Sequence, residues 1–205
     1  MSSAASRSWA GTTLADRRSE RRARLLDVGL ELLGTQGSTA VSVRSVCRQA
    51  KLTDRYFYEN FADRDEFVLA VYDQVAAEAS SALICAVAAH PTADGVETVA
   101  RAATEAFLGV LTDDPRKGRI LLLEPLSDPS LGIRSVAVAP MFAELVRGSL
   151  GAEATAQGAE LTATALVGAL ANVFIRWLDG TLVIERDALI DYCVRLLVVF
   201  TDLAR

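Results

Sequence analysis

Apolar residues recur at intervals of three and four along most of the chain, and this spacing restricts the possible folds more than any other feature. Clear examples are the segments 16–34, 63–90 and 161–178. An α-helix has about 3.6 residues per turn, so side chains at these intervals lie on one face. Proline and glycine, which interrupt helices, account for only 5 and 13 of the 205 residues. The sequence therefore predicts an all-α fold.

Composition narrows the class of protein. Hydrophobic residues make up 51% of the chain and charged residues 23%, the usual mixture of a soluble protein. No uncharged apolar run reaches the roughly 18 residues that a membrane span needs, so no membrane partner is expected. Cys47, Cys85 and Cys193 lack the spacing of metal sites. Because no secretory signal is recognised either, we expect these cysteines to be reduced thiols in the cytoplasm. Cys85 and Cys193 are expected in the hydrophobic core.

Charge is distributed unevenly along the chain. Residues 1–65 contain 11 basic and 8 acidic side chains, whereas residues 66–205 contain 10 basic and 18 acidic ones. A basic N-terminal part attached to an acidic remainder fits a protein that touches phosphate groups at one end only. The alternative is that these arginines are ordinary solvent-exposed residues at the starts of helices.

Two short helices are predicted between residues 42 and 60. Ser42 occupies an N-cap position before residues 43–50, and Thr53 does so before a second helix that reaches Asn60. Phe57 and Phe61 lie four residues apart, on the inner face of that second helix. Two short helices joined by a tight turn and packed on a longer first helix form a helix-turn-helix. The second helix of this motif can enter the major groove of DNA.

At these residues the chain resembles a known family. The segment from Arg22 to Val75, which includes VSVRSVCRQAKLTDRYFYENFADRDEFVLAVYDQV, is similar to the DNA-binding part of TetR-type regulators. The resemblance implies an N-terminal three-helix DNA-binding domain over residues 16–65. It also implies a C-terminal helical ligand-binding and dimerisation domain over residues 66–205. Residues 1–15 are small and polar, and are predicted to form a disordered tail.

The resemblance also implies roles for single residues. The side chains expected at double-stranded DNA are Ser42, Arg44, Thr53, Arg55, Tyr56, Tyr58, Asn60 and Arg64. Those that fall where family members contact phosphate are Ser42, Tyr58 and Arg64. The recognition helix departs from the family pattern at residues 54–56, and we hypothesise that Arg55 reads a guanine. Alternatively, Asp54 pairs with Arg55 or Arg64 and only fixes the helix.

A ligand cavity is expected between the helices of the second domain, because the family has one there. Its candidate wall residues are Phe107, Leu111, Leu122, Met141, Phe142, Phe174 and Trp177. Each of them could equally be plain core. Glu124 and Arg176 place charges within apolar segments, so each must find a partner or face a polar ligand group. The aromatic and aliphatic candidates favour a largely apolar small-molecule effector.

The last two predicted helices, 161–178 and 185–203, suggest a homodimer. The first is apolar on nearly every side and carries small residues at 165, 168, 169 and 171, which would allow a partner helix to approach closely. Two such helices can pair with their copies in a four-helix bundle, and a dimer can read a palindromic operator. Alternatively, both helices pack only within one subunit. Residues 148–160 are predicted to form a loop.

Residues for catalysis are not evident. The single histidine, His90, precedes Pro91 at a helix end and has no nucleophile or acid at a useful spacing. No metal-binding cluster or phosphate-binding glycine loop is found, so neither an enzyme nor a cofactor is expected. The prediction is a transcriptional repressor that a small ligand releases from DNA. Alternatives are a protein of the same fold that acts without a ligand and, least favoured, an enzyme.

Overall fold

The computed structural model describes residues 14–90, 95–149 and 155–203. Its helices are α1 (Leu14–Gln36), α2 (Val43–Ala50), α3 (Asp54–Tyr58), α4 (Arg64–Ala89), α5 (Val96–Asp113), α6 (Pro115–Gly118), α7 (Pro129–Ser149), α8 (Ala156–Leu178) and α9 (Arg186–Leu203). A 3₁₀ turn covers Ser38–Ala40, and a π-helical turn (Arg119–Leu123) and a 3₁₀ turn (Glu124–Leu126) connect α6 to α7. Over these ranges the chain forms no strand, which confirms the all-α prediction.

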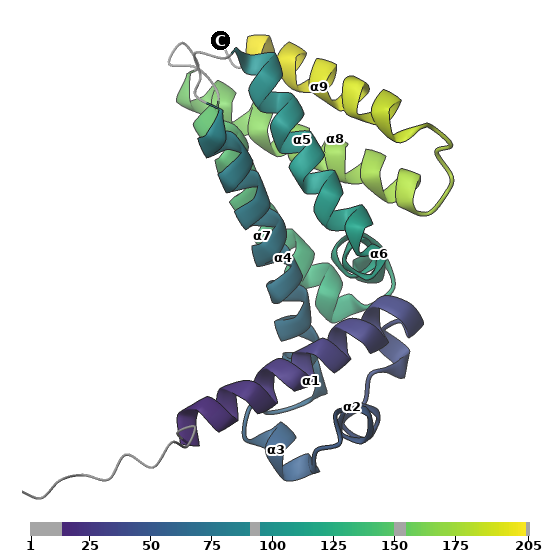
Figure 1. Cartoon of the computed structure of the whole chain (residues 1–205). Helices are drawn as coiled ribbons and strands as arrows, with labels where there is room; N and C mark the ends of the chain where they lie inside the picture. The colour runs from purple at the N-terminus through teal and green to yellow at the C-terminus, as the bar shows by residue number, and fades with distance from the viewer. Residues whose placement is uncertain (1–13, 91–94, 150–154, 204–205) are drawn as a thin grey trace, which may run out of the picture.

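The helices form two groups at opposite ends of an elongated molecule (Figure 1). Helices α1, α2 and α3 make the lower group, here called the head. Helices α4 to α9 make the upper group, here called the body, and α4 runs directly out of the head. In the body, α5 lies between α4 and α9, while α7 packs against both α4 and α8.

The head is built by the local signals that its sequence carries. The Ser42 hydroxyl accepts a hydrogen bond from the Ser45 backbone N–H at 3.0 Å and so caps α2, as predicted. Lys51 ends α2 in a left-handed conformation, with φ at 52°. Thr53 stands at the N-cap of α3, but its side chain makes no capping hydrogen bond.

Aromatic packing fixes the short helix α3 on the rest of the head. Phe57 is fully buried, and its ring lies 5.5 Å from the ring of Phe61 and 5.3 Å from that of Phe67. Phe67 belongs to α4, so the same cluster joins the head to the first helix of the body. An isolated five-residue helix is unstable in water. The position of α3 therefore depends on this cluster.

Several predicted boundaries differ from the structure, and α3 ends at Tyr58, before the predicted end at Asn60. The segment expected to be a loop over residues 148–160 is shorter, because α7 continues to Ser149 and α8 starts at Ala156. The Thr155 hydroxyl accepts from the Gly158 backbone N–H at 3.0 Å, and this cap starts the helix earlier than the apolar spacing suggested. The predicted tail, residues 1–15, lies outside the described residues except for the first two residues of α1.

Three helices are long and apolar enough to cross a membrane by length and composition alone. They lie within Arg64–Ala89, Pro129–Gly148 and Ala156–Leu178. Each of the three contains a few charged side chains, so none of them is an uncharged apolar run. In this fold α7 packs against the other two, and apolar side chains of all three line a cavity described below.

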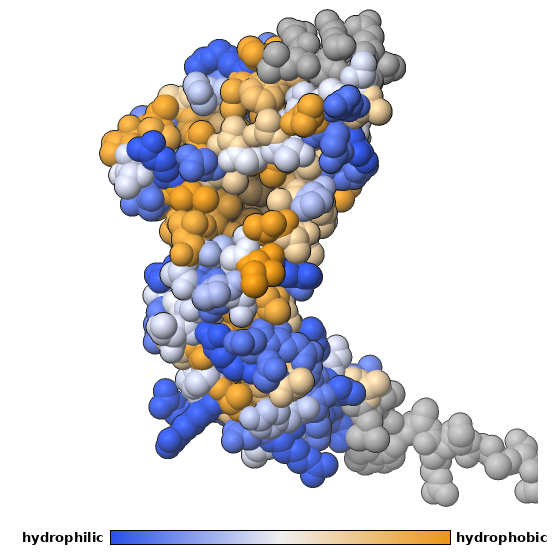
Figure 2. All heavy atoms as spheres, turned by 180° about the vertical axis from the view of Figure 1, so that it is seen from behind, coloured by the Kyte–Doolittle hydropathy of each residue, from blue (hydrophilic) through white to orange (hydrophobic). Residues whose placement is uncertain are grey.

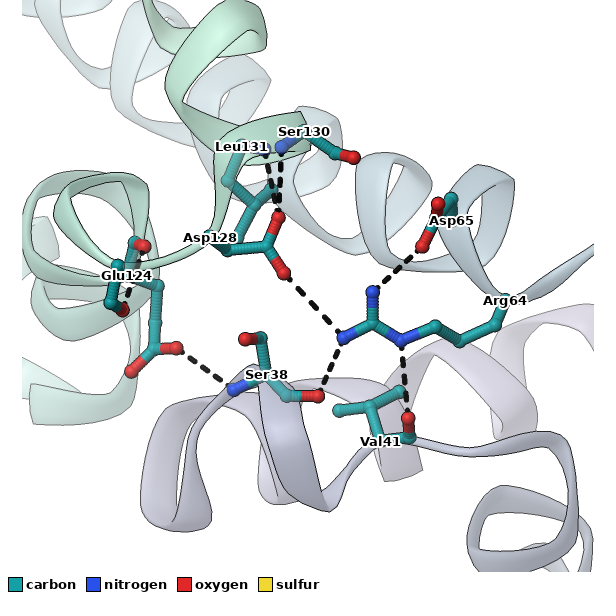
Figure 3. A network of polar contacts seen from close by, with 9 residues as sticks. Ser38, Val41, Arg64, Asp65, Glu124, Asp128, Ser130 and Leu131 are labelled. Carbon is teal, nitrogen blue, oxygen red and sulfur yellow. Dashed lines mark hydrogen bonds and ion pairs between the residues drawn. The ribbon is translucent and has the colours of Figure 1, made fainter.

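Arg64, the first residue of α4, links head and body through a polar network (Figure 3). Its guanidinium donates to the Ser38 carbonyl oxygen at 2.6 Å and to the Val41 carbonyl oxygen at 3.2 Å. The same group lies 3.5 Å from the Asp128 carboxylate, at the start of α7. Asp128 in turn accepts from the backbone N–H groups of Ser130 and Leu131 and caps α7.

Glu124 forms the second half of this network. Its carboxylate is buried, with 4% of the residue exposed. It accepts from the Ser38 backbone N–H at 2.9 Å and from Arg119 Nε at 2.8 Å. Gly37 precedes this contact with φ at 84°, a conformation that favours glycine. We call Ser38, Arg64, Glu124 and Asp128 the joint, because they connect the loop after α1 to the segment before α7.

Close helix packing predicts opposite effects for two glycine substitutions. A Cβ on Gly29 of α1 would lie 2.5 Å from Val71 Cγ2 and 2.6 Å from Phe67 Cζ. Gly29→Ala should therefore lower the free energy of unfolding by about 1–3 kcal/mol through overpacking. Gly109→Ala in α5 meets nothing closer than 3.6 Å and should raise it by about 0.5–1 kcal/mol. Urea denaturation measures both, and a shift in the same direction for both variants would contradict this packing.

The joint predicts a pH-dependent contribution to stability. Burial alone would raise the pKa of Asp128, but the Leu131 N–H, the Ser38 hydroxyl and the Arg64 charge outweigh it, so the pKa is lowered. A carboxyl group whose pKa is lower in the folded than in the unfolded protein stabilises the fold. This stabilisation is fully present above the pKa of the unfolded chain, about 4, and is lost as the pH falls through the pKa of the folded protein.

Asp128→Asn should therefore cost about 1–3 kcal/mol of unfolding free energy at pH 7, and the difference from the native protein should shrink below pH of about 4. Asp65→Asn is the matched control, because Asp65 pairs with the same guanidinium at 2.7 Å but is exposed. Its cost should stay under about 1 kcal/mol. Equal losses for the two variants in denaturation across pH would refute the role given to burial.

Candidate functional site

The outer face of α2 and α3 carries most of the side chains expected at DNA. The exposed members of that set are Ser42, Arg44, Thr53, Arg55 and Tyr58. Tyr58 is 58% exposed although it is a large aromatic residue. Its ring packs edge-on against buried Phe57 at 5.6 Å between centroids, which holds it at the surface. The structure thus brings these five side chains onto the exposed surface of the helix-turn-helix.

Tyr56 and Asn60 are half-buried and engaged within the head. The Arg21 guanidinium lies 4.4 Å from the centre of the Tyr56 ring, and it also approaches the Glu59 carboxylate at 3.7 Å. Asn60 Nδ2 donates to the Tyr56 carbonyl oxygen at 2.7 Å and thereby closes the end of α3. These two residues are better placed to hold the recognition helix than to reach bases.

Helix α1 contributes contacts that the sequence patterns did not reveal. Arg18 donates to the Glu59 carbonyl oxygen, and its Nε lies 3.4 Å from Asn60 Oδ1. Together with Arg21, it fastens the C-terminal end of α3 to α1. Part of the basic charge of this segment, which the sequence predicts to face phosphate groups, is therefore used inside the head.

Arg55 and Asp54, at the start of α3, do not pair with each other. The Arg55 side chain is 85% exposed and forms an ion pair with Glu59 one turn later, at 3.1 Å. The Asp54 carboxylate accepts a hydrogen bond from the Cys47 thiol instead. Burial, and then Asp54, raise the pKa of Cys47 to about 11. The Cys47 thiol is thus protonated and unreactive at neutral pH.

Arg64 has a different position from the one that a phosphate contact would require. It lies in the joint, where Ser38, Val41, Asp65 and Asp128 surround its guanidinium. Its side chain is 31% exposed, so it is not fully sequestered. The geometry favours a role in orienting the head, and a phosphate contact stays a prediction without support from these distances.

The body contains a cavity of about 1130 Å³. Helices α4, α5, α7, α8 and α9 contribute to its wall, together with the segment between α6 and α7. Figure 2 shows that apolar side chains gather over the body on this face of the molecule, whereas hydrophilic ones dominate the head. Most of the residues along the wall are aliphatic or aromatic, which suits a ligand that is largely apolar.

Four of the seven candidate wall residues line this cavity, namely Phe107, Leu122, Phe142 and Phe174. The rings of Phe107 and Phe174 lie 5.4 Å apart, and Phe107 also contacts Phe142. The other three, Leu111, Met141 and Trp177, are not on the wall. Leu111 is fully buried core, Met141 is 39% exposed, and Trp177 donates from its indole to the Ile184 carbonyl oxygen at 3.0 Å.

The body also shows the surroundings of five other residues that the sequence analysis singled out. Glu124 is partnered in the joint, as described above, while Arg176 is exposed and needs no buried partner. Cys85 is exposed, not core, because the outer face of α4 near its end is apolar yet uncovered in the single chain. Cys193 is buried, as expected. His90 Nδ1 lies 3.0 Å from the Ala86 carbonyl oxygen, a local contact at the end of α4.

Comparison with known proteins agrees with this arrangement. Residues 25–71, which cover most of α1 through the first two turns of α4, match the model of the family described as bacterial regulatory proteins, tetR family. This segment contains all the side chains expected at DNA. No curated protein matches the chain in sequence.

Solved structures match over nearly the whole chain. A TetR-like transcriptional regulator from Rhodococcus sp. RHA1 shares 25% identity, with a TM-score of 0.64 over 86% of this chain and 93% of the other. The multidrug binding protein EbrR, solved with imidazole, shares 22% identity (TM-score 0.63, coverage 86% and 94%). FadR from Bacillus subtilis, solved with stearoyl-CoA, shares 14% (TM-score 0.71, coverage 86% and 97%).

The family match falls on the helix-turn-helix, and the structural matches extend the likeness through the body. TetR-family regulators bind DNA and are not enzymes, in line with the sequence expectation. Residues 25–71 therefore form a DNA-binding domain of the tetR family, and the whole chain has the fold of TetR-like transcriptional regulators.

Proposed function

We propose that the protein is a homodimeric, cytoplasmic repressor that binds a palindromic operator and leaves it when a small, largely apolar ligand enters the cavity. The observation that carries this proposal is that the cavity wall and the joint share one segment. Leu122 and Pro125 line the cavity, and Glu124 between them holds the Ser38 backbone N–H of the head. A ligand that moves this segment also moves the support of the DNA-binding helices.

The same relation holds at the start of α7. Gly132 and Ser135 line the cavity, while Asp128, one turn earlier, faces Arg64 in the joint. A ligand shifts a conformational equilibrium only if it binds one state more tightly than the other. Because the carboxylates of the joint are buried and hydrogen-bonded, they favour a few distinct orientations of the head relative to the body over a continuous range of orientations. The ligand would favour an arrangement in which the two heads do not fit successive DNA grooves.

Exposed stripes on α8 and α9 support the homodimer. Small residues of α8 are exposed at Ala165 and Gly168, and no atom would contact a Cβ added to Gly168 within 4 Å. Leu161, one turn before Ala165, is a large apolar residue that is 64% exposed. On α9, Tyr192 and Val199 are exposed by 47% and 57%. The two helices pack against each other, so both stripes can face a second copy in a four-helix bundle.

Ligands of similarly folded proteins fit the proposed effector class. EbrR is a multidrug binding protein, and the FadR structure holds stearoyl-CoA, whose long acyl chain, unlike its anionic CoA part, belongs to the proposed class. The cavity of about 1130 Å³ in this chain is large enough for a drug-sized or lipid-like molecule. Its apolar wall favours such molecules over strongly ionic ones.

Two substitutions in α3 should separate base reading from phosphate contact. The operator is first obtained by binding-site selection on the purified protein. Arg55→Ala should then lose about 1–3 kcal/mol at one base position and leave other sequences little changed, since its exposed ion pair with Glu59 is weak. Tyr58→Phe should weaken all sequences alike. Uniform weakening by Arg55→Ala, measured by fluorescence anisotropy on operator and mismatch duplexes, would exclude guanine reading.

Release by ligand is tested with compounds that stabilise the protein in a thermal-shift screen of apolar molecules. A stabilising compound should lower operator affinity by about 5- to 150-fold at saturation. In Glu124→Gln the ligand should still bind, because this residue is off the cavity wall, but the effect on operator affinity should fall. An effector that leaves operator affinity unchanged at saturation would rule out the mechanism.

A further inference from the structure

Tyr72 of α4 is a buried polar side chain on the cavity wall. The residue is 2% exposed, and it lines the cavity two turns from the joint end of α4. Burial is the main reason that its pKa is raised to about 12, with the Asp73 charge adding to this and Arg134 opposing it. Tyr72 therefore carries a neutral hydroxyl at physiological pH, able to donate one hydrogen bond and to accept others.

The hydroxyl groups around the cavity differ in how they are satisfied. Thr104 donates to the Ala100 carbonyl oxygen at 2.8 Å, and Ser135 donates to that of Gly132 at 2.8 Å. Thr201 donates to the Val198 carbonyl oxygen at 2.6 Å. Within the described parts of the chain, no protein group forms a hydrogen bond with the hydroxyl of Tyr72, or with that of Thr164, which is an exposed residue of α8. The Tyr72 oxygen is not among the polar atoms that are fully buried and unpartnered, so it is accessible from the cavity, where a water or a ligand atom can complete its hydrogen bonding.

Charged groups near the wall are already neutralised. Beside Tyr72, Asp73 and Arg134 form a two-pronged pair with N–O distances of 2.7 and 2.8 Å. Elsewhere on the wall Arg147 lies between the carboxylates of Glu144 and Glu160. Over the described wall, no arginine or lysine is left to balance an anionic ligand group, and the other basic side chain there, His90, lies at the opposite end of α4 from the joint. An ionised carboxylate beside Tyr72 would therefore lose hydration without gaining a counter-charge.

We propose that the Tyr72 hydroxyl is the specificity-determining contact for the effector and binds a neutral oxygen, a ketone, ester or alcohol, on an otherwise apolar molecule. This inference rests on the proposed function, because it concerns the same cavity. It narrows the ligand from any apolar compound to one with a neutral hydrogen-bonding group at the end of the cavity near the joint. Anionic fatty acids would be selected against.

Competition binding tests this assignment on the full-length protein. The neutral fluorophore N-phenyl-1-naphthylamine, which has no oxygen, reports occupation of the cavity. Dodecan-2-one and dodecanoate then compete for the site, since they share an alkyl chain and differ in the charge of the oxygen group. Tyr72→Phe removes only the hydroxyl. Thr104→Val is the matched control, because the Thr104 hydroxyl is on the same wall but is already bonded to its own helix.

The native protein should bind dodecan-2-one more tightly than dodecanoate. Tyr72→Phe should weaken dodecan-2-one by about fivefold, the value expected for one neutral hydrogen bond, and should leave the fluorophore unchanged. Thr104→Val should change neither. Preference for dodecanoate, or a ketone affinity that does not depend on the Tyr72 hydroxyl, would overturn the assignment while leaving ligand-controlled release intact. If the fluorophore does not bind the native protein, the thermal shifts caused by dodecan-2-one and dodecanoate make the same comparison, and an equal ketone shift for the native protein and Tyr72→Phe would overturn the assignment.

Discussion

The buried carboxylate of Glu124 is the contact on which the two-part architecture depends. A charge at this depth is tolerated only because Arg119 and the Ser38 backbone N–H satisfy it. The head therefore cannot leave the body without removing the Ser38 N–H from this buried carboxylate, which would then keep only Arg119 as a partner. Arg64 and Asp128 add a second connection beside the first. Together these contacts make the orientation of the DNA-binding helices a property of the body, where the cavity lies.

Local signals made the head predictable. Ser42 caps α2, the short turn at Lys51 ends it, and Phe57 of α3 and Phe61 just after it are buried together, all within about twenty residues. Such signals act between neighbours in the sequence, so they can be recognised without knowledge of the fold. The long helices were equally accessible, because apolar spacing repeats over many turns. The early start of α8 was not predicted, because the Thr155 cap lies outside the apolar pattern.

The cavity and the joint depend on contacts between distant segments, and these were not predictable in detail. Leu108 and Leu111 of α5 are core, whereas Phe107 of the same helix faces the cavity, although all three are apolar. Which side of a helix meets empty space is decided by how its neighbours cross it. Arg64 has the residue type of a phosphate contact, yet backbone carbonyls from a loop more than twenty residues away surround it. Only the fold brings these groups together.

The joint has a chemical asymmetry with a consequence for how such proteins diversify. The body contributes the side chains of Arg64, Arg119 and Glu124, whereas the head contributes mainly the main-chain groups of Ser38 and Val41. Main-chain groups persist when the amino acid changes. Apart from Ser38, whose hydroxyl contributes, the side chains of this loop can therefore vary without loss of the contacts in the joint, provided that the path of the backbone is kept. A body of this kind can accept heads with new operator preferences, and chimaeras joined at the beginning of α4 have a physical basis.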